Sequence, residues 1–123
     1  MSYTELTIAD QKIGIRFGLP AIRQIGAKMQ AYELFSGDSY NELGLAHILY
    51  AGYCNECVIN DKVPSVPFNQ FYTFVETAVE DKKAEEIVAA IRVFEASKQL
   101  KEAVSKVSQE QKKRAGKKST LTK

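Results

Sequence analysis

The sequence predicts a mainly α, small α+β protein, in which an N-terminal β-hairpin packs on a compact bundle of about four helices. Over residues 3–17, apolar and polar side chains alternate, which is typical of strands that bury one face. From residue 20 onwards, apolar side chains instead recur every three or four residues, which is typical of amphipathic helices. Glycine, proline and other turn residues divide this second part into four segments.

The hairpin is expected to pair residues 3–8 with residues 13–17 around a turn at Asp10-Gln11. Its buried face would combine Leu6, Ile8, Ile13, Ile15 and Phe17. Gly18 ends the alternation, and Pro20 can occupy the first turn of a helix, because the amide hydrogen that it lacks is not needed there.

The first helix is expected to run from Pro20 to about Phe35. Its apolar stripe would be formed by Ile22, Ile25, Met29 and Tyr32. Gly26 lies beside this stripe, where the missing side chain would let another element approach closely.

The second helix is expected to begin at Ser39, because Ser39 and Glu42 have the spacing of a capping box. From Leu43 to Val58, apolar residues go almost all the way round the helix. Leu43, Tyr50 and Cys54 lie on one side, and Leu45, Ile48, Leu49 and Tyr53 on the other. A helix of this kind is usually buried among its neighbours, so we expect it at the centre of the domain.

A loop over residues 60–67 separates this helix from a third one, which is expected from Phe68 to Glu80. Its apolar stripe would be Phe68, Phe71, Tyr72, Val75 and Val79. Asp81 is expected to cap a fourth helix. The inner face of that helix would hold Ile87, Val88, Ile91 and Phe94. Ser97 and Lys98 then interrupt the stripe, so we expect the second half of this helix to be more exposed.

Residues 1–109 are expected to form one globular domain, and residues 110–123 a disordered basic tail. After residue 110, the tail has six basic residues and no acidic one: Lys112, Lys113, Arg114, Lys117, Lys118 and Lys123. The whole chain has a net charge of +2, so the domain itself is mildly acidic. Because the tail has almost no apolar side chains, it cannot bury enough surface to offset the entropy lost on ordering.

No catalytic residue, metal ligand or cofactor is expected. Cys54 and Cys57 have the spacing of a CxxC motif, but they lie near the end of a helix, whereas a thioredoxin-like motif stands at its start. A structural zinc ion needs four ligands, and only His47 supplies a further candidate. We therefore expect the cysteines to pack as small apolar side chains and His47 to be a core or partner-contact residue.

The sequence also lacks a phosphate-binding loop and a nucleophile motif, so the protein is not expected to be an enzyme. No stretch approaches the roughly 20 apolar residues that span a bilayer, and residues 1–6 do not have the order of a signal peptide. A cytoplasmic protein without a membrane partner is expected.

Three blocks, in this order, resemble the tail assembly chaperone family of siphophages and related prophages. The first is Ile13-Gly-Ile-Arg-Phe-Gly-Leu-Pro-Ala-Ile-Arg23, and the second is Ile48-Leu-Tyr-Ala-Gly-Tyr53. The third is Phe68-Asn-Gln-Phe-Tyr-Thr-Phe-Val-Glu76, followed by a helix that carries Phe94-Glu-Ala-Ser-Lys98. Pro67 departs from the family, whose members often have Ser or Thr there to cap the third helix.

The resemblance implies a late viral protein of the host bacterial cytoplasm that is not retained in the mature virion. It implies binding to the tape measure protein, whose long apolar seams need cover, and recruitment of tail tube protein. A homo-oligomer and a longer, frameshifted form are left open. We expect Leu100, Val104 and Val107 to form part of the partner surface or a self-association surface, because they are apolar and outside the main core.

Two alternatives are open. The first is a small nucleic-acid-associated regulator that uses the basic tail as an arm; nucleic acid is not the expected partner, because the acidic domain offers no supporting basic patch. The second is a structural tail component, such as a completion protein, which would be found in purified virions.

Overall fold

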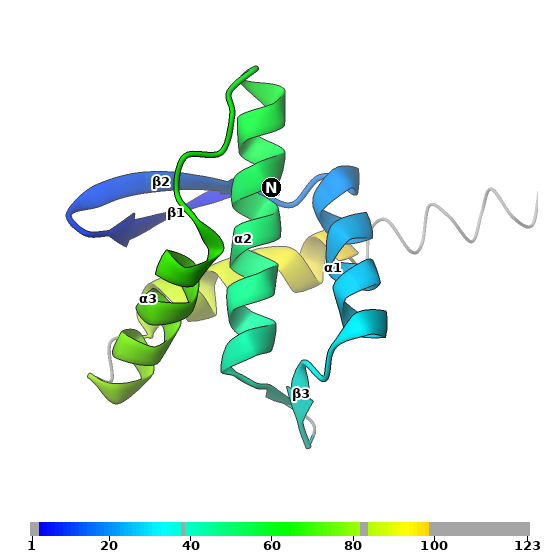
Figure 1. The fold of residues 1–123 in the computed structure, drawn as a ribbon, viewed down its shortest axis with the longest axis vertical. Helices are drawn as coiled ribbons and strands as arrows, with labels where there is room; N and C mark the ends of the chain where they lie inside the picture. The colour runs from blue at the N-terminus through cyan, green and yellow to red at the C-terminus, as the bar shows by residue number, and fades with distance from the viewer. Residues whose placement is uncertain (1–2, 38, 82–83, 99–123) are drawn as a thin grey trace, which may run out of the picture.

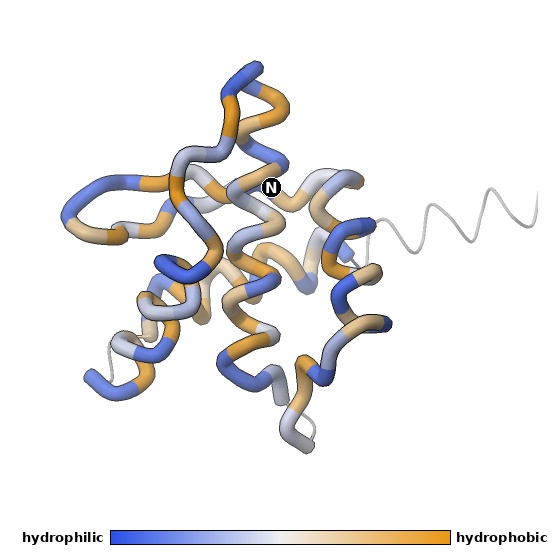
Figure 2. Tube along the Cα trace, in the orientation of Figure 1, coloured by the Kyte–Doolittle hydropathy of each residue, from blue (hydrophilic) through white to orange (hydrophobic). Residues whose placement is uncertain are grey.

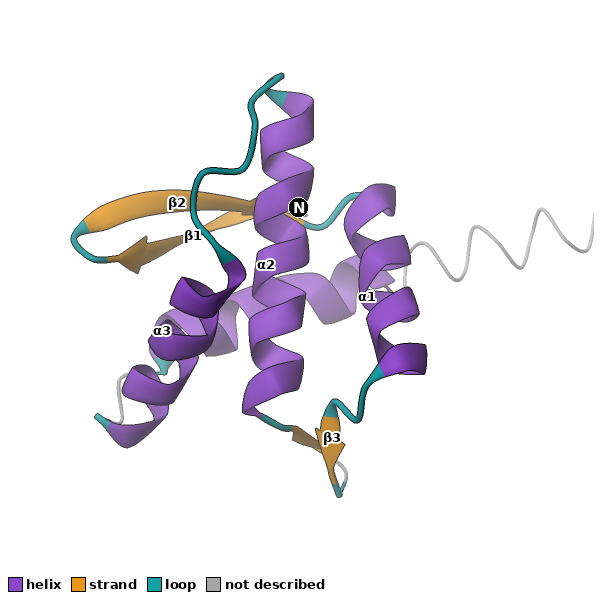
Figure 3. Ribbon diagram, in the orientation of Figure 1, coloured by secondary structure: helices purple, strands orange, loops and turns teal. Residues whose placement is uncertain are grey.

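The long helix α2 (Glu42–Ile59) is the central element of the computed structural model, which describes residues 3–37, 39–81 and 84–98. In Figure 1, α1 (Leu19–Ala31) and α3 (Phe68–Glu80) lie on either side of α2, and the N-terminal hairpin and a fourth helix, over residues 85–98, pass behind it. The predicted fold class is confirmed: a β-hairpin is followed by four helices (Figure 3).

The hairpin pairs β1 (Tyr3–Ile8) with β2 (Gln11–Arg16) in antiparallel register, with Leu6 opposite Ile13. Its turn is Ala9-Asp10, one residue earlier than expected. Ala9 and Asp10 both have positive φ, 53° and 63°, which is the pattern of a type I′ turn and suits the right-handed twist of the strands. All five side chains predicted for the inner face are buried: Leu6, Ile8, Ile13, Ile15 and Phe17.

Helix α1 ends four residues before the predicted end at Phe35, because the chain must leave the helix to bury Leu34. Phe35–Ser36 (β3) then pairs with Ser39–Tyr40 (β4) in a short second hairpin that the helical periodicity did not indicate. Leu34 is 1% exposed, and its carbonyl accepts a hydrogen bond from the backbone amide of Asn41 over 3.0 Å. If α1 continued as a helix, Leu34 could not take this buried position.

The predicted capping box at Ser39 and Glu42 is wrong. Ser39 belongs to β4, and the N-cap of α2 is Asn41, whose Oδ1 accepts a hydrogen bond from the backbone amide of Gly44 over 2.8 Å. Asn is as good an N-cap as Ser, so the second hairpin decides between the two candidate starts.

The close approach predicted at Gly26 occurs at another glycine. A Cβ atom added at residue 26 would meet no atom within 4 Å. A Cβ at residue 52, in contrast, would overlap Cγ2 of Ile15, and one at residue 44 would overlap the carbonyl oxygen of Leu34. Gly52 is therefore the position at which the hairpin rests directly on the backbone of α2.

Helix α3 has the predicted bounds, although Pro67 supplies no side-chain cap. Phe71 and Val75 are buried as expected, whereas Ala78 replaces Val79 on the inner side, and Val79 is 46% exposed. Asp81 is the C-cap of α3 and not the start of the next helix. The fourth helix begins instead after Ala84, whose carbonyl accepts from the amide of Val88 over 2.8 Å.

The inner face of the fourth helix is made by Ile87, Ala90, Phe94 and Ser97, which are buried, with Ile91 half-buried. Val88 was predicted to face inward but is 46% exposed, since it lies about 100° around the helix from Ile87. The burial of Ser97 agrees with its predicted inward position. Two long-range contacts attach this helix: Glu86 accepts from the backbone amide and the hydroxyl of Thr7, both over 3.1 Å, and Tyr40 donates to Glu95 over 2.5 Å.

The core is shared by the N-terminal hairpin and all four helices, and within it the rings of Phe17 and Phe94 are 5.4 Å apart. Figure 2 shows apolar segments along the inner sides of these elements, and also at the C-terminal end of α2 and in the loop that follows. None of the helices in the described part of the chain is long and apolar enough to cross a membrane.

Candidate partner-binding surface

The predicted site residues lie outside the part of the chain that the structure describes. This applies to the expected partner surface, Leu100, Val104 and Val107, and to the basic tail residues Lys112, Lys113, Arg114, Lys117 and Lys118. The candidate surface in the described part of the chain consists of Tyr32, which follows α1, and of residues of α2 and α3.

The CxxC residues stand near the end of α2, as expected. Cys57 is buried, Cys54 is half-buried, and burial raises the pKa of the Cys54 thiol, so this environment does not activate it as a nucleophile. Among the described residues, no three His, Cys, Asp or Glu side chains come together in a way that could hold a metal ion. Cys57 packs in the core as a small apolar side chain.

One side of α2 is left partly open by its neighbours. Leu43, His47, Tyr50 and Cys54 are half-buried and Val58 is 66% exposed, and their spacing places all five within one narrow row along the helix. Most of the buried residues of α2, such as Ile48, Ala51 and Tyr53, point in other directions. The sequence indicated that Leu43, Tyr50 and Cys54 share a side, but not that this side would be the open one.

Aromatic rings from α2, from the start of α3 and from the residue after α1 meet at the middle of this row. The imidazole of His47 stacks on the ring of Tyr32, just after α1, with ring centres 5.5 Å apart and planes at 14°. Its other neighbour is Phe68 at the start of α3, at 4.4 Å and 23°. Phe68 also meets Tyr50 edge-on at 5.6 Å. Since Tyr32 is 51% exposed, this stack reaches from the core to the solvent.

We call this surface the aromatic face and define it as Tyr32, Leu43, His47, Tyr50, Cys54, Phe68 and Tyr72. Tyr72 is half-buried and lies one helical turn after Phe68 on α3. Most of these side chains combine a large apolar area with one polar group, which is the composition enriched at protein–protein contacts.

One basic residue borders the aromatic face. Lys28, on α1, has its ammonium group 5.6 Å from the centre of the Tyr32 ring. On α3, Glu76 and Glu80 are exposed and lie about 80° and 120° around the helix from Phe68, away from the buried Phe71 and Val75. No acidic residue occurs in α1 and no basic residue in α3. Burial and then the charge of Lys28 lower the pKa of His47, which favours the neutral imidazole.

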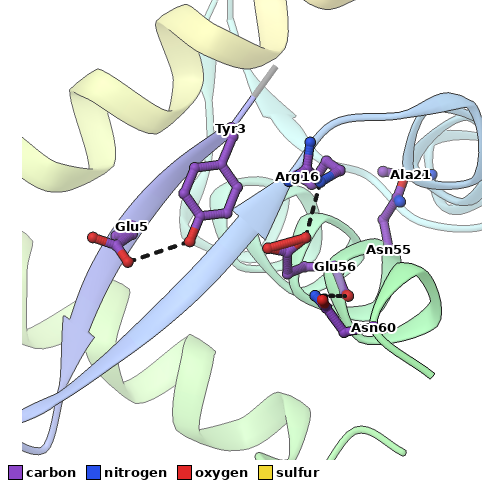
Figure 4. Close-up of polar contacts among 7 residues, drawn as sticks. All are labelled: Tyr3, Glu5, Arg16, Ala21, Asn55, Glu56 and Asn60. Atoms are coloured by element: carbon purple, nitrogen blue, oxygen red, sulfur yellow. Dashed lines mark hydrogen bonds and ion pairs between the residues drawn. The ribbon is translucent and has the colours of Figure 1, made fainter. Parts of the chain in front are cut away.

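Polar contacts on the other side of α2 hold the scaffold of this face (Figure 4). The guanidinium of Arg16, in β2, donates to the carboxylate of Glu56 over 2.8 Å. One residue earlier in α2, Oδ1 of Asn55 accepts from the backbone amide of Ala21 over 3.1 Å. Both contacts start from α2, so this helix positions the hairpin and α1 together.

A hollow of about 340 Å³ lies between the hairpin, the end of α2 and the following loop. Its charged lining mixes Glu5 and Glu56 with Lys12 and Lys62, so it concentrates neither sign of charge. The loop wall is fixed by Tyr53, whose hydroxyl accepts from the backbone amides of Ser65 and Val66 over 2.8 and 3.0 Å. The hollow has the character of a polar surface depression.

Compared with known proteins, the chain matches no family model, no curated protein and no solved structure. The fold and the aromatic face therefore define a class in physical terms only: a small α+β protein with a partly exposed apolar surface.

Proposed function

We propose that the protein is a binding protein that does no chemistry itself and holds partner chains through the aromatic face. More particularly, we propose that it is a phage tail assembly chaperone, which binds the tape measure protein and helps to recruit tail tube protein. The particular proposal rests on the resemblance of the three sequence blocks. The contacts of α2 support the more general proposal of a binding protein.

The observation that carries the proposal is the open row on α2. A central helix with apolar residues all round would normally be covered on every side, yet α1 and α3 leave the row from Leu43 to Cys54 only partly buried and Val58 exposed. An amphipathic helix is a natural complement for an apolar face of this shape, and a tape measure protein offers long helices with apolar seams. Covering such a seam reversibly is what an assembly chaperone must do.

The proposal is tested by producing the chain together with the tape measure protein of the same genome and measuring how much of the latter stays soluble and copurifies. We expect the wild-type chain to keep it soluble. Tyr32→Glu places a charge at the exposed end of the ring stack and should reduce copurification at least about tenfold, as loss of an interface anchor does. Val88→Glu is the matched control, because Val88 is 46% exposed, close to the 51% of Tyr32, but lies on the fourth helix.

Circular dichroism must first show that both variants are folded. If the wild-type chain does not bind the tape measure protein, the chaperone assignment is wrong. If Tyr32→Glu binds as Val88→Glu does, the partner surface is elsewhere, and Leu100, Val104 and Val107 become the residues to substitute. The genes beside this one give an independent test, since a tube gene upstream and a very long helical gene downstream are expected.

A further inference from the structure

We propose that two carboxylates, Glu5 and Glu86, close the free edge of the N-terminal hairpin and so prevent β1 from pairing with β1 of a second copy of this chain. The edge of a sheet has unpaired N–H and C=O groups and is a template for another strand, so natural proteins protect such edges. This inference goes beyond the proposed function and does not depend on the aromatic face, which lies on other elements.

The free edge is the side of β1 that points away from β2. In the register of the hairpin, Thr7 lies opposite Lys12, yet its backbone amide donates to Oε1 of Glu86 over 3.1 Å and not to β2. Because hydrogen-bonded and non-hydrogen-bonded pairs alternate in an antiparallel ladder, the N–H and C=O groups of Tyr3 and Glu5 also point away from β2. Among the described residues, the sheet has no third strand that could pair with them.

The opposite edge of the hairpin is less available. Strand β2 packs against α2, where Arg16 donates to Glu56, and in Figure 4 β2 lies between β1 and the end of α2. The sequence of β1, Tyr-Thr-Glu-Leu-Thr-Ile, is rich in aromatic and β-branched residues and has one charge, which favours strand pairing. Two copies would therefore meet through β1 on both sides, in a twofold-symmetric sheet of four strands.

Glu86 occupies the position that a second copy would need. The longest antiparallel pairing of two β1 strands places Thr7 of each copy opposite Tyr3 of the other, so it uses the outward amide of Thr7. The carboxylate of Glu86 already accepts from this amide and from the Thr7 hydroxyl, both over 3.1 Å. The next residue on the fourth helix, Ile87, is buried in the core and holds Glu86 at this place. A strand can be added only if the carboxylate leaves.

Glu5 opposes the same pairing by its charge. In that register Glu5 lies at the twofold axis, opposite Glu5 of the second copy. Like charges directly opposite each other on neighbouring strands are destabilising. Glu5 is exposed, and its Oε2 accepts from the hydroxyl of Tyr3 over 3.2 Å, so the carboxylate stays beside β1. The edge is therefore protected at its centre by Glu5 and at Thr7 by Glu86.

The experiment compares the self-association of full-length variants by sedimentation equilibrium, after circular dichroism has shown that each is folded. Glu5→Thr combined with Glu86→Ala should self-associate at least about tenfold more tightly than the wild type, which is the effect of about one regained hydrogen bond. Each single variant should show a smaller gain. Glu76→Ala combined with Glu85→Ala is the control, because it removes the same charge from exposed helical positions and should behave as the wild type does.

A proline tests whether the association uses the strand edge. Since the amide of residue 5 points away from β2, Glu5→Pro removes it without breaking a hydrogen bond between β1 and β2. Glu5→Pro combined with Glu86→Ala should therefore associate no more than the wild type does. In the associating variant, hydrogen exchange at the amides of residues 5 and 7 should slow as the protein concentration is raised.

If Glu86→Ala disturbs the fourth helix, Glu86→Leu replaces it, because leucine favours helix and still lacks the carboxylate. No gain in the combined variant would overturn the inference. The same gain in the control, or a gain that Glu5→Pro leaves intact, would overturn it as well. These outcomes do not bear on the solubility of the tape measure protein, which decides the proposed function separately.

Discussion

Asn55, in the second half of α2, caps the first turn of α1: its Oδ1 accepts a hydrogen bond from the backbone amide of Ala21 over 3.1 Å. Asn55 is 3% exposed and Ala21 is fully buried. Gly18, at the N-cap position of α1, has no side chain for this task, and a Cβ there would lie 2.8 Å from Oδ1 of Asn55. The start of α1 is therefore capped by another helix.

Asn55→Ala should lower the free energy of unfolding by about 1–3 kcal/mol, because it leaves a buried amide of α1 without a partner. Urea unfolding followed by circular dichroism measures this. Asn60→Ala is the control, since Asn60 is exposed and donates only to the carbonyl of Glu56 at the end of α2. It should cost less than about 0.5 kcal/mol. Equal losses in the two variants would mean that the Asn55 cap is unimportant.

Gly52→Ala and Gly26→Ala should change stability in opposite directions. A methyl group at residue 52 overlaps Ile15, so the hairpin must shift, which costs about 1–3 kcal/mol. A methyl group at residue 26 meets open space inside a helix, where Ala is favoured over Gly by about 0.5–1 kcal/mol. Thermal unfolding of both variants checks the pair; a more stable Gly52→Ala would contradict the direct contact between hairpin and α2.

Tyr53→Phe should loosen the loop between α2 and α3 while leaving the ring packing intact. Its hydroxyl accepts hydrogen bonds from the amides of Ser65 and Val66, which would lose this partner at a cost of about 1–2 kcal/mol. We expect faster hydrogen exchange at these two amides. Tyr72→Phe, on the aromatic face, is the comparison and should leave exchange at Ser65 and Val66 unchanged.

His47 should make the protein less stable in mild acid. Its pKa in the folded protein lies below the ordinary value of 6.5, mainly because of burial and further because of Lys28, so the unfolded chain takes up the proton first. The contribution of the neutral His47 to stability is therefore complete above pH 6.5, and it is lost as the pH drops from there towards the pKa of the folded protein. His47→Phe keeps a stacked ring without the titration.

The measurement compares the free energy of unfolding at about pH 7.5 and about pH 5.5. The loss on acidification should be larger for the wild type than for His47→Phe. In addition, Lys28→Met should raise the pKa of His47, as followed by the NMR shifts of its ring protons. An unchanged or lower pKa in Lys28→Met would contradict the proximity of the two side chains.

The rival reading, a nucleic-acid-associated regulator, makes a separate prediction about salt. Binding through the basic tail would weaken steeply as salt rises, and replacing Lys112, Lys113, Lys117 and Lys118 by Gln would abolish it. The chaperone proposal predicts no specific DNA complex at physiological salt. A fluorescence anisotropy titration at several salt concentrations measures this, and a sequence-specific complex that survives physiological salt would favour the regulator.

Much of the fold could be read from periodicity, because burial of one face leaves a repeat in the chain itself. The alternation in residues 3–17 predicted both strands, and the stripe of α3 predicted its bounds from Phe68 to Glu80. The all-round apolar pattern of α2 predicted its central place. These features depend on neighbours in sequence, so the sequence alone determined them.

The wrong predictions concern positions at which two local signals indicated different structures. Contacts between residues far apart in sequence determine which structure forms there. Helix α1 stops early because Leu34 is buried in the core. Asn41 and not Ser39 is the N-cap of α2, because Ser39 and Tyr40 form β4 and pair with β3. Gly26 and Gly52 both stand in helices, and only the position of Ile15 shows which one is essential.

The aromatic face is also determined by contacts between residues far apart in sequence. The sequence determined that Leu43, Tyr50 and Cys54 share a side of α2 and that His47 would be a core or contact residue. Only the tertiary structure decided that Tyr32 and Phe68 stack on His47 and that this side remains half-exposed. The physical reason is that exposure depends on which directions around a helix its neighbours fill, and α1, α3 and the hairpin come from parts of the chain far apart in sequence.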